Sequence, residues 1–257
     1  MPLEFSIAAY RFGHSMVRAS YDWNANFGSP GDQRPAAAFN LLFLFTGNGG
    51  LAGSQSLPNN WPAQFERLTG VEPRPLTASD QVPSRFARKI DTHIAPPLGN
   101  LSNEGTTETS DRIRRLLKRL AVRNLVRGYR LAIPTGQAVA RSLGITPLTR
   151  TQLLATPPGG RAAPTAVDDA LVDGGFLEDT PLWFYVLREA EVLEDGQRLG
   201  PVGSRIVAET IIGQLRADPS SFINTGWDPT QGVTTGPAST DVVDSITTFL
   251  RFATMHP

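Results

Sequence analysis

Residues 4–18, with the sequence EFSIAAYRFGHSMVR, decide the predicted fold. Apolar side chains recur along two faces of this stretch, at the spacings of three and four residues that are typical of a helix. One face carries Phe5, Ala8, Ala9, Phe12 and Met16, and the other carries Ile7, Tyr10, His14 and Val17. Because a helix that is apolar on two faces is normally buried, we expect residues 4–18 to form one buried helix.

The same spacing predicts further helices along the chain. They cover residues 111–126, 180–194, Pro201–Ala217 and a last segment from a Ser239 or Thr240 cap to Leu250, with shorter ones at 62–68, 137–143 and 149–155. In Pro201–Ala217 the positions expected to face inward are Ile206, Val207, Ile211 and Leu215. No stretch alternates clearly between apolar and polar residues, and the 24 Gly and 21 Pro fall between the helical segments. The predicted fold class is therefore mainly α, with helices joined by long irregular loops.

Composition excludes several classes of protein. The chain has 24 Lys and Arg against 24 Asp and Glu, so no net charge attracts it to phosphate backbones and no nucleic-acid partner is expected. It has no cysteine, which excludes thiolate metal sites and cysteine nucleophiles. The longest apolar run, residues 41–45, is far shorter than the roughly 20 residues of a membrane-spanning helix. No membrane span or signal peptide is predicted, and the compartment stays open.

Two stretches suggest binding sites but have simpler explanations. Gly47, Gly49 and Ala52 fit a dinucleotide fingerprint, yet Pro58 and Pro62 limit the helix that this motif needs, so an ordinary glycine-rich loop is favoured. Residues 112–130 contain eight basic side chains in nineteen positions, which could bind RNA, a membrane or an acidic partner. Long basic side chains also commonly solvate the outer face of an amphipathic helix, and we favour that interpretation.

Histidine is scarce, which shortens the search for metal or acid–base sites. His256 lies next to the last residue, and His93 precedes a proline pair in a predicted loop. His14 lies within the helix predicted to be buried, three residues after Arg11. A core histidine is more often a packing residue than a ligand. However, a buried arginine needs an anion, and Glu4 is the only carboxylate nearby in sequence, so a cofactor that carries carboxylates would satisfy both residues.

Four blocks of sequence resemble one protein family. Residues 4–15, EFSIAAYRFGHS, closely resemble the proximal-histidine helix of the animal-type haem peroxidases. Residues 124–134, NLVRGYRLAIP, are similar in spacing to the family's Asn-x-x-Arg-Gly-Arg-Asp-x-Gly-x-Pro stretch. The blocks TPLW at 180–183 and LGPVGSRIVAE at 199–209 look like the helices that follow in bacterial members. Because the four blocks occur in order and span most of the chain, the chain is identified as a member of this family.

The resemblance implies a haem cofactor and a role for four residues. His14 matches the proximal histidine that binds the haem iron, and Asn124 matches the asparagine that accepts a hydrogen bond from the other imidazole nitrogen. Arg11 and Arg127 match basic residues near the haem propionates. In place of the Arg-Asp-His of many animal members the chain has Tyr-Arg-Leu at 129–131, so the interactions of those residues are not expected here.

The resemblance also implies that part of the catalytic machinery is missing. Family members cleave peroxide with a distal histidine and arginine, which precede the proximal helix by a long stretch of sequence. We therefore expect residues 1–257 to be the C-terminal, proximal portion of a single haem peroxidase domain, an oxidoreductase that uses hydrogen peroxide to oxidise an unknown donor. No catalytic residue is expected in this chain, and a missing N-terminal half or a partner chain would complete it.

Two other functions remain open at this point. One is a non-catalytic module that binds haem or a partner protein but has lost peroxidase turnover. The other is an interaction protein that uses the basic residues of 112–130, which we rank last.

Overall fold

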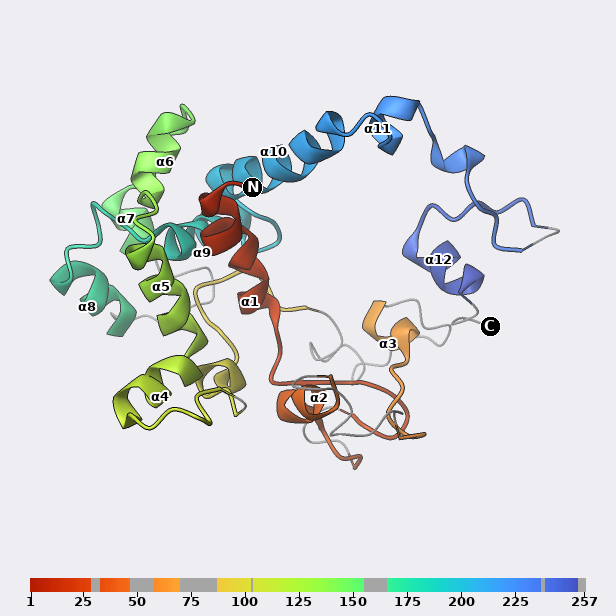
Figure 1. Ribbon diagram of the computed structural model, residues 1–257, viewed down its shortest axis with the longest axis horizontal. Coiled ribbons are helices and arrows are strands. Elements are labelled where there is room, and N and C mark those ends of the chain that lie inside the picture. Colours follow the sequence, from red (N-terminus) through yellow and green to blue (C-terminus); the bar gives the residue numbers. More distant parts are fainter. Residues whose placement is uncertain are drawn as a thin grey trace. The chain divides into compact units, whose positions relative to one another are not determined.

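A computed structural model of the protein describes residues 1–28, 33–46, 58–69, 87–102, 104–154, 166–236 and 239–253. The chain divides into two compact units. Unit 1 contains residues 1–17 and 88–214, and unit 2 contains residues 18–87 and 215–257. Helices are the main regular structure of the chain (Figure 1), so the prediction of a mainly α protein is confirmed.

Unit 1 is built around helix α9 (Leu182–Glu194). Its other elements are the π-helix η1 (Glu4–Ala8), the 3-10 helix η2 (Ala9–Phe12), α1 (Gly13–Met16), the 3-10 helix η4 (Pro96–Gly99), α4 (Asp111–Lys118), α5 (Leu120–Arg130), α6 (Gly136–Ser142), α7 (Arg150–Leu154), α8 (Ala166–Asp173) and α10 (Pro201–Ala217), which ends in unit 2. Helix α9 packs against η1, η2, α5, α6 and α7. Two of the elements that carry candidate site residues, η2 and α5, therefore pack on one helix.

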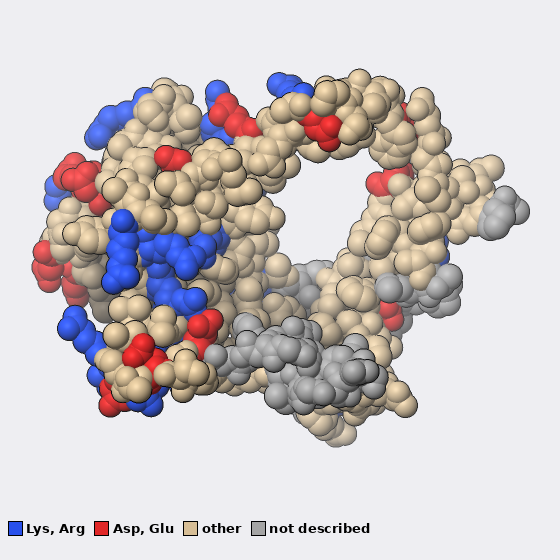
Figure 2. All heavy atoms as spheres, in the orientation of Figure 1, with Lys and Arg blue, Asp and Glu red and all other residues tan. Residues whose placement is uncertain are grey.

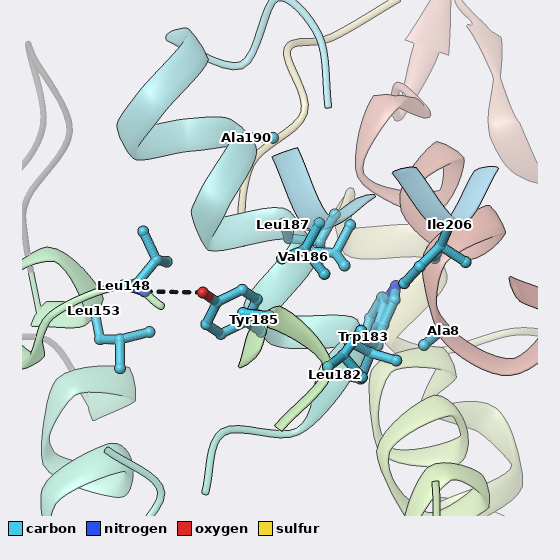
Figure 3. Close-up of a cluster of buried hydrophobic side chains, with 14 of the residues drawn as sticks. Ala8, Leu148, Leu153, Leu182, Trp183, Tyr185, Val186, Leu187, Ala190 and Ile206 are labelled. Carbon is cyan, nitrogen blue, oxygen red and sulfur yellow. Dashed lines mark hydrogen bonds between the residues drawn. The ribbon is translucent and has the colours of Figure 1, made fainter. Parts of the chain in front are cut away.

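The core of unit 1 forms on α9 because this helix is apolar on most of its circumference. Leu182, Tyr185 and Val186 are almost fully buried (Figure 3). The Tyr185 hydroxyl accepts a hydrogen bond of 2.8 Å from the backbone N–H of Leu148, so the one polar atom of this side chain is satisfied in the core. Gly136 lets α6 approach α9 closely, since a Cβ there would lie 2.0 Å from the Tyr185 ring.

Left-handed backbone residues end α9, and a carboxylate caps the start of α10. Asp195 and Gly196 end α9 in the left-handed conformation. The buried carboxylate of Glu189 in α9 accepts hydrogen bonds from the backbone N–H groups of Val202 and Gly203, at 2.9 and 3.2 Å, and so caps the N-terminus of α10. Burial raises the pKa of Glu189, while these two N–H groups act in the opposite direction.

Two of the predicted helices are divided in the structure. The expected helix over 4–18 consists of η1, η2 and α1 and ends at Met16. The expected helix over 111–126 is broken at Arg119, whose backbone is extended, and resumes as α5 beyond the predicted end to Arg130. Apolar periodicity continues through such breaks, so it does not locate them.

Two smaller predictions were wrong. The last helix, α12 (Ile246–Phe252), begins at a Ser245 capping box and not at Ser239 or Thr240. Ile211 of α10 is 40 % exposed, although its spacing predicted an inward position, whereas Ile206 is buried as expected. The bounds of α10 itself were predicted correctly, because Pro201 is a strong signal for a first helical turn.

Unit 2 has shorter elements and a small strand pair that the sequence did not predict. It contains β1 (Ser20–Tyr21), β2 (Ala37–Ala38), α2 (Phe39–Thr46), α3 (Phe65–Thr69), α11 (Phe222–Thr225), the 3-10 helix η5 (Pro229–Gln231) and α12. The strands are antiparallel, with Ser20 opposite Ala38. The Trp23 indole donates to the Trp61 carbonyl at 2.7 Å, and the two rings lie 5.9 Å apart. Within the described residues of both units, no helix has the length and apolar character needed to span a membrane.

Candidate functional site

His14 and Asn124 meet in unit 1 although 110 positions separate them in the sequence. The amide nitrogen Nδ2 of Asn124, in α5, lies 3.0 Å from Nδ1 of His14, in α1. Asn124 is 3 % exposed, and His14 is half-buried. The other ring nitrogen, Nε2, has no hydrogen-bond partner among the described residues. One nitrogen of the imidazole is thus fixed by the protein, and the other has no partner in the described part of the chain.

The same amide binds Arg11. Nη1 of Arg11 donates to Oδ1 of Asn124 at 3.0 Å, so the buried amide connects the guanidinium to the imidazole. We call this series of contacts the Arg11–Asn124–His14 relay. Because both polar atoms of the Asn124 side chain are used, the amide can sit in the interior at little energetic cost.

The direction of the hydrogen bonds in the relay differs from the expectation. A guanidinium can only donate, so Arg11 takes the single acceptor atom of the Asn124 amide. The amide then presents its N–H to His14, which makes Nδ1 the acceptor and leaves the ring proton on Nε2. The family resemblance implied the reverse, with Asn124 accepting from the ring.

Side-chain donors bind the backbone of the irregular segment that carries Arg11 and His14. Nε of Arg11 donates to the Ser6 carbonyl at 3.0 Å, and the Trp183 indole donates to the Arg11 carbonyl at 3.2 Å. The segment that receives these bonds forms a π turn followed by a 3-10 turn, and the Arg11 carbonyl also accepts the backbone N–H of Gly13. Arg11 ends up in the 3-10 turn and His14 in the α turn α1 that follows it, and the side chains of both reach the Asn124 amide.

Positive charge is concentrated beside His14. Burial is the main cause that lowers the pKa of Arg11, and the charges of Arg127 and Arg123 lower it further. Arg123 has a carboxylate partner, Glu104, at 3.0 Å. Arg127 is exposed on α5, and in the described part of the chain neither it nor Arg11 pairs with a carboxylate. A partly buried guanidinium without a counter-ion, that of Arg11, favours an anionic ligand at this place, and the exposed Arg127 adds positive charge beside it.

The surroundings of His14 favour its neutral form. Burial lowers its pKa, and the charge of Arg11 lowers it further. The neutral imidazole is the form that binds a metal.

Trp183 is a site residue that the sequence pattern did not single out. It lies in α9, is 6 % exposed, and meets the His14 ring edge-on with the ring centroids 6.4 Å apart. In the sequence it is one of several apolar residues of a core helix, and no spacing separates it from the others. Its position beside the relay follows from the packing of α9 on η2.

The remaining histidines and the glycine-rich motif do not join this site. His93 is exposed in the loop before η4. His256, Gly47, Gly49 and Ala52 lie outside the described residues.

The basic residues of 112–130 are divided between the surface and the site. Figure 2 shows Lys and Arg side chains gathered over α5. Arg112, Arg115, Arg119 and Arg130 are exposed, as expected for a solvated helix face. The partly buried Arg123 and the exposed Arg127 are close enough to Arg11 to lower its pKa.

The donor set suits a haem better than a bare metal ion. No group of three or more His, Cys, Asp or Glu side chains that could hold an ion occurs in the described part of the chain. A haem iron already has four porphyrin nitrogens and needs one protein ligand, and Nε2 of His14 can serve as that ligand when the ring proton is on Nδ1. The unpaired Arg11 and Arg127 suit the two propionates. Residues 129–131, where the chain departs from the family pattern, are all exposed and make no hydrogen bond to the relay.

Comparisons of the chain with protein-family models, with curated proteins and with solved structures found no match.

Proposed function

We propose that this chain binds haem through Nε2 of His14 and forms the proximal, iron-ligating part of a haem peroxidase. The observation that carries the proposal is the half-buried imidazole, fixed at Nδ1 by a buried asparagine and without a partner at Nε2. The four sequence blocks that resemble the family support it, because two of them supply the relay residues. Bound haem would supply the redox-active iron at which peroxide is reduced.

The residues of the relay would orient the ligand and hold its proton. When Nε2 binds a metal, the proton of a neutral imidazole is on Nδ1, which then needs an acceptor. Oδ1 of Asn124 is that acceptor if the side-chain amide rotates so that Oδ1 and Nδ2 exchange places. A neutral amide acceptor makes the imidazole less anionic than a carboxylate would. Arg11 must then find another acceptor, and a propionate provides a charge-assisted one. Binding of the carboxylates and orientation of the ring are therefore coupled through one side chain.

A non-catalytic haem-binding module is the second candidate. Peroxide cleavage in the family uses a histidine as acid–base catalyst and an arginine that stabilises the developing charge. Apart from His14, the only described histidine is His93, which is exposed in a loop. We therefore propose that haem binding belongs to this chain and that peroxide turnover needs residues beyond those described.

Titration of the purified chain with haemin tests the proposal. Wild type and His93→Ala should shift the Soret band in the same way and saturate at equimolar haemin, whereas His14→Ala should lose the spectrum of a histidine-ligated haem. Circular dichroism before haemin addition checks that His14→Ala is folded. An unchanged Soret shift in His14→Ala would exclude His14 as the ligand.

Peroxide-dependent oxidation of a chromogenic phenol separates the two candidates. The haem-loaded chain should not exceed free haemin in turnover if it is a non-catalytic module. Turnover well above that of free haemin, lost in His14→Ala, would instead make the chain an enzyme by itself.

A further inference from the structure

Trp183 contacts both outer members of the relay. Its indole Nε1–H donates to the backbone carbonyl of Arg11 at 3.2 Å, and its ring meets the ring of His14 edge-on. Trp183 is nearly buried and comes from α9, 172 positions from Arg11. No other described side chain donates to the backbone of η2 or α1 from a distant part of the sequence.

The backbone that Trp183 contacts does not keep one hydrogen-bonding pattern along its length. Residues 4–16 pass from a π turn to a 3-10 turn to a single α turn, and Ala8 at the first junction has a φ of −124° and a ψ of −74°. Short 3-10 pieces have weaker hydrogen-bond geometry than an α-helix. The rotation of Arg11 and His14 toward Asn124 therefore depends on contacts from outside the segment.

Helix α9 is a suitable support for such a contact. Leu182, on one side of Trp183, is 1 % exposed, and Tyr185 and Val186 are fully buried. Close-packed side chains of this kind hold single rotamers, so the indole N–H is fixed in position relative to the core. Precise placement of a ligand generally requires that its supporting residues are themselves fixed.

We propose that Trp183 is a positioning residue, whose indole N–H holds the turn at Arg11 and so keeps Arg11 and His14 in register with the Asn124 amide. The effect of Trp183 on haem binding rests on the proposed function. Its effect on the Arg11–Asn124–His14 relay does not, because that effect is present in the chain without haem. Loss of the N–H would let the turn relax toward a regular helix. Arg11 and His14 would then no longer both reach Asn124, and His14 would exchange between its two neutral forms.

Replacement of Trp183 by Phe tests this proposal against a matched control, Trp23→Phe. The control also loses an indole bond to a backbone carbonyl, that of Trp61 at 2.7 Å, but in unit 2. Nitrogen-15 spectra of histidine-labelled protein without haem show which ring nitrogen of His14 carries the proton. In wild type and Trp23→Phe, the protonated and the unprotonated ring nitrogen of His14 should give two well-separated chemical shifts. In Trp183→Phe the two shifts should approach each other, because the ring exchanges between its two neutral forms. Haemin affinity should fall about tenfold in Trp183→Phe, which corresponds to one lost hydrogen bond.

If Trp183→Phe does not fold, 3-benzothienylalanine at position 183 replaces the N–H by sulfur and keeps the shape of the ring. Unchanged His14 shifts in a folded variant without the N–H would overturn the proposal, as would equal changes in Trp23→Phe. If wild type does not bind haemin, the proposed function fails, yet the spectra of the haem-free chain still decide the role of Trp183.

Discussion

Removal of the Arg11 guanidinium should release the Asn124 amide. In Arg11→Met the side chain keeps much of its length, but Oδ1 of Asn124 loses the donor that lies 3.0 Å away in the structure. The amide can then present either its oxygen or its nitrogen to His14, because it can form one hydrogen bond with Nδ1 in both orientations. The two neutral forms of the His14 ring should therefore both become populated.

The size of the effect follows from the one bond that differs between the two amide orientations. A hydrogen bond between a charged and a neutral group contributes about 1.5–3 kcal/mol. Since about 1.4 kcal/mol corresponds to a factor of ten, Arg11 should favour the Nε2-protonated ring by roughly ten- to a hundredfold. Wild type should thus show essentially one form, and Arg11→Met a mixture.

Nitrogen-15 spectra of the histidine ring measure this preference in the haem-free chain. Arg123→Met is the control, because Arg123 also adds charge near Arg11 but pairs with Glu104 and makes no bond to Asn124. Its His14 ring should match wild type. A ring that stays protonated only on Nε2 in Arg11→Met, or that carries its proton on Nδ1 in wild type, would refute this account of the relay.

Three further predictions concern the stability of unit 1, each measured by urea unfolding. Tyr185→Phe leaves the buried Leu148 N–H without its acceptor and should cost about 1–3 kcal/mol; a cost below about 0.5 kcal/mol would contradict it. Gly136→Ala puts a methyl group into the Tyr185 ring and should cost about 3 kcal/mol, whereas Gly213→Ala, in open space, should be neutral or stabilising. Because the pKa of Glu189 is raised above 4.5 on folding, the native state binds the extra proton, and stability should fall as pH rises from 4.5 through the folded pKa. Glu189→Gln should weaken that fall, and an unchanged slope would show that other groups cause it.

The sequence predicts the elements whose signals are local. Helix α10 begins at Pro201 and ends at Ala217 as expected, because a proline in the first turn and apolar residues at helical spacing are both readable from the chain. The mainly α class follows in the same way. Both are signalled by neighbouring residues, although Glu189 of α9 also caps the N-terminus of α10.

The irregular segment before His14 could not be predicted because distant partners determine it. Its composition and spacing are those of an ordinary buried helix. The bond from Trp183 to the Arg11 carbonyl comes from a helix 172 positions away, and no local pattern records it. The break at Arg119 is similar, since Arg119 has good helix propensity but an extended backbone in the structure.

The resemblance selected three residues that meet in the candidate site, but neither Trp183 nor the hydrogen bonds. The resemblance selected Arg11, Asn124 and His14, and the structure brings all three together. That Arg11 takes the amide oxygen, and so reverses the bond to the ring, depends on the side-chain geometry of the folded chain. Arg127 was expected near an anion, and the structure places it on an exposed part of α5, within electrostatic range of Arg11.

The iron–imidazole bond is the most direct test of the proposed haem site. Resonance Raman spectra of the reduced, haem-loaded chain, recorded with two iron isotopes, detect the stretching vibration between iron and a histidine nitrogen. The account predicts an isotope-sensitive band that is present in wild type and His93→Ala and absent in His14→Ala. A band that persists in His14→Ala, or a wild type that binds haem without showing one, would contradict ligation by His14.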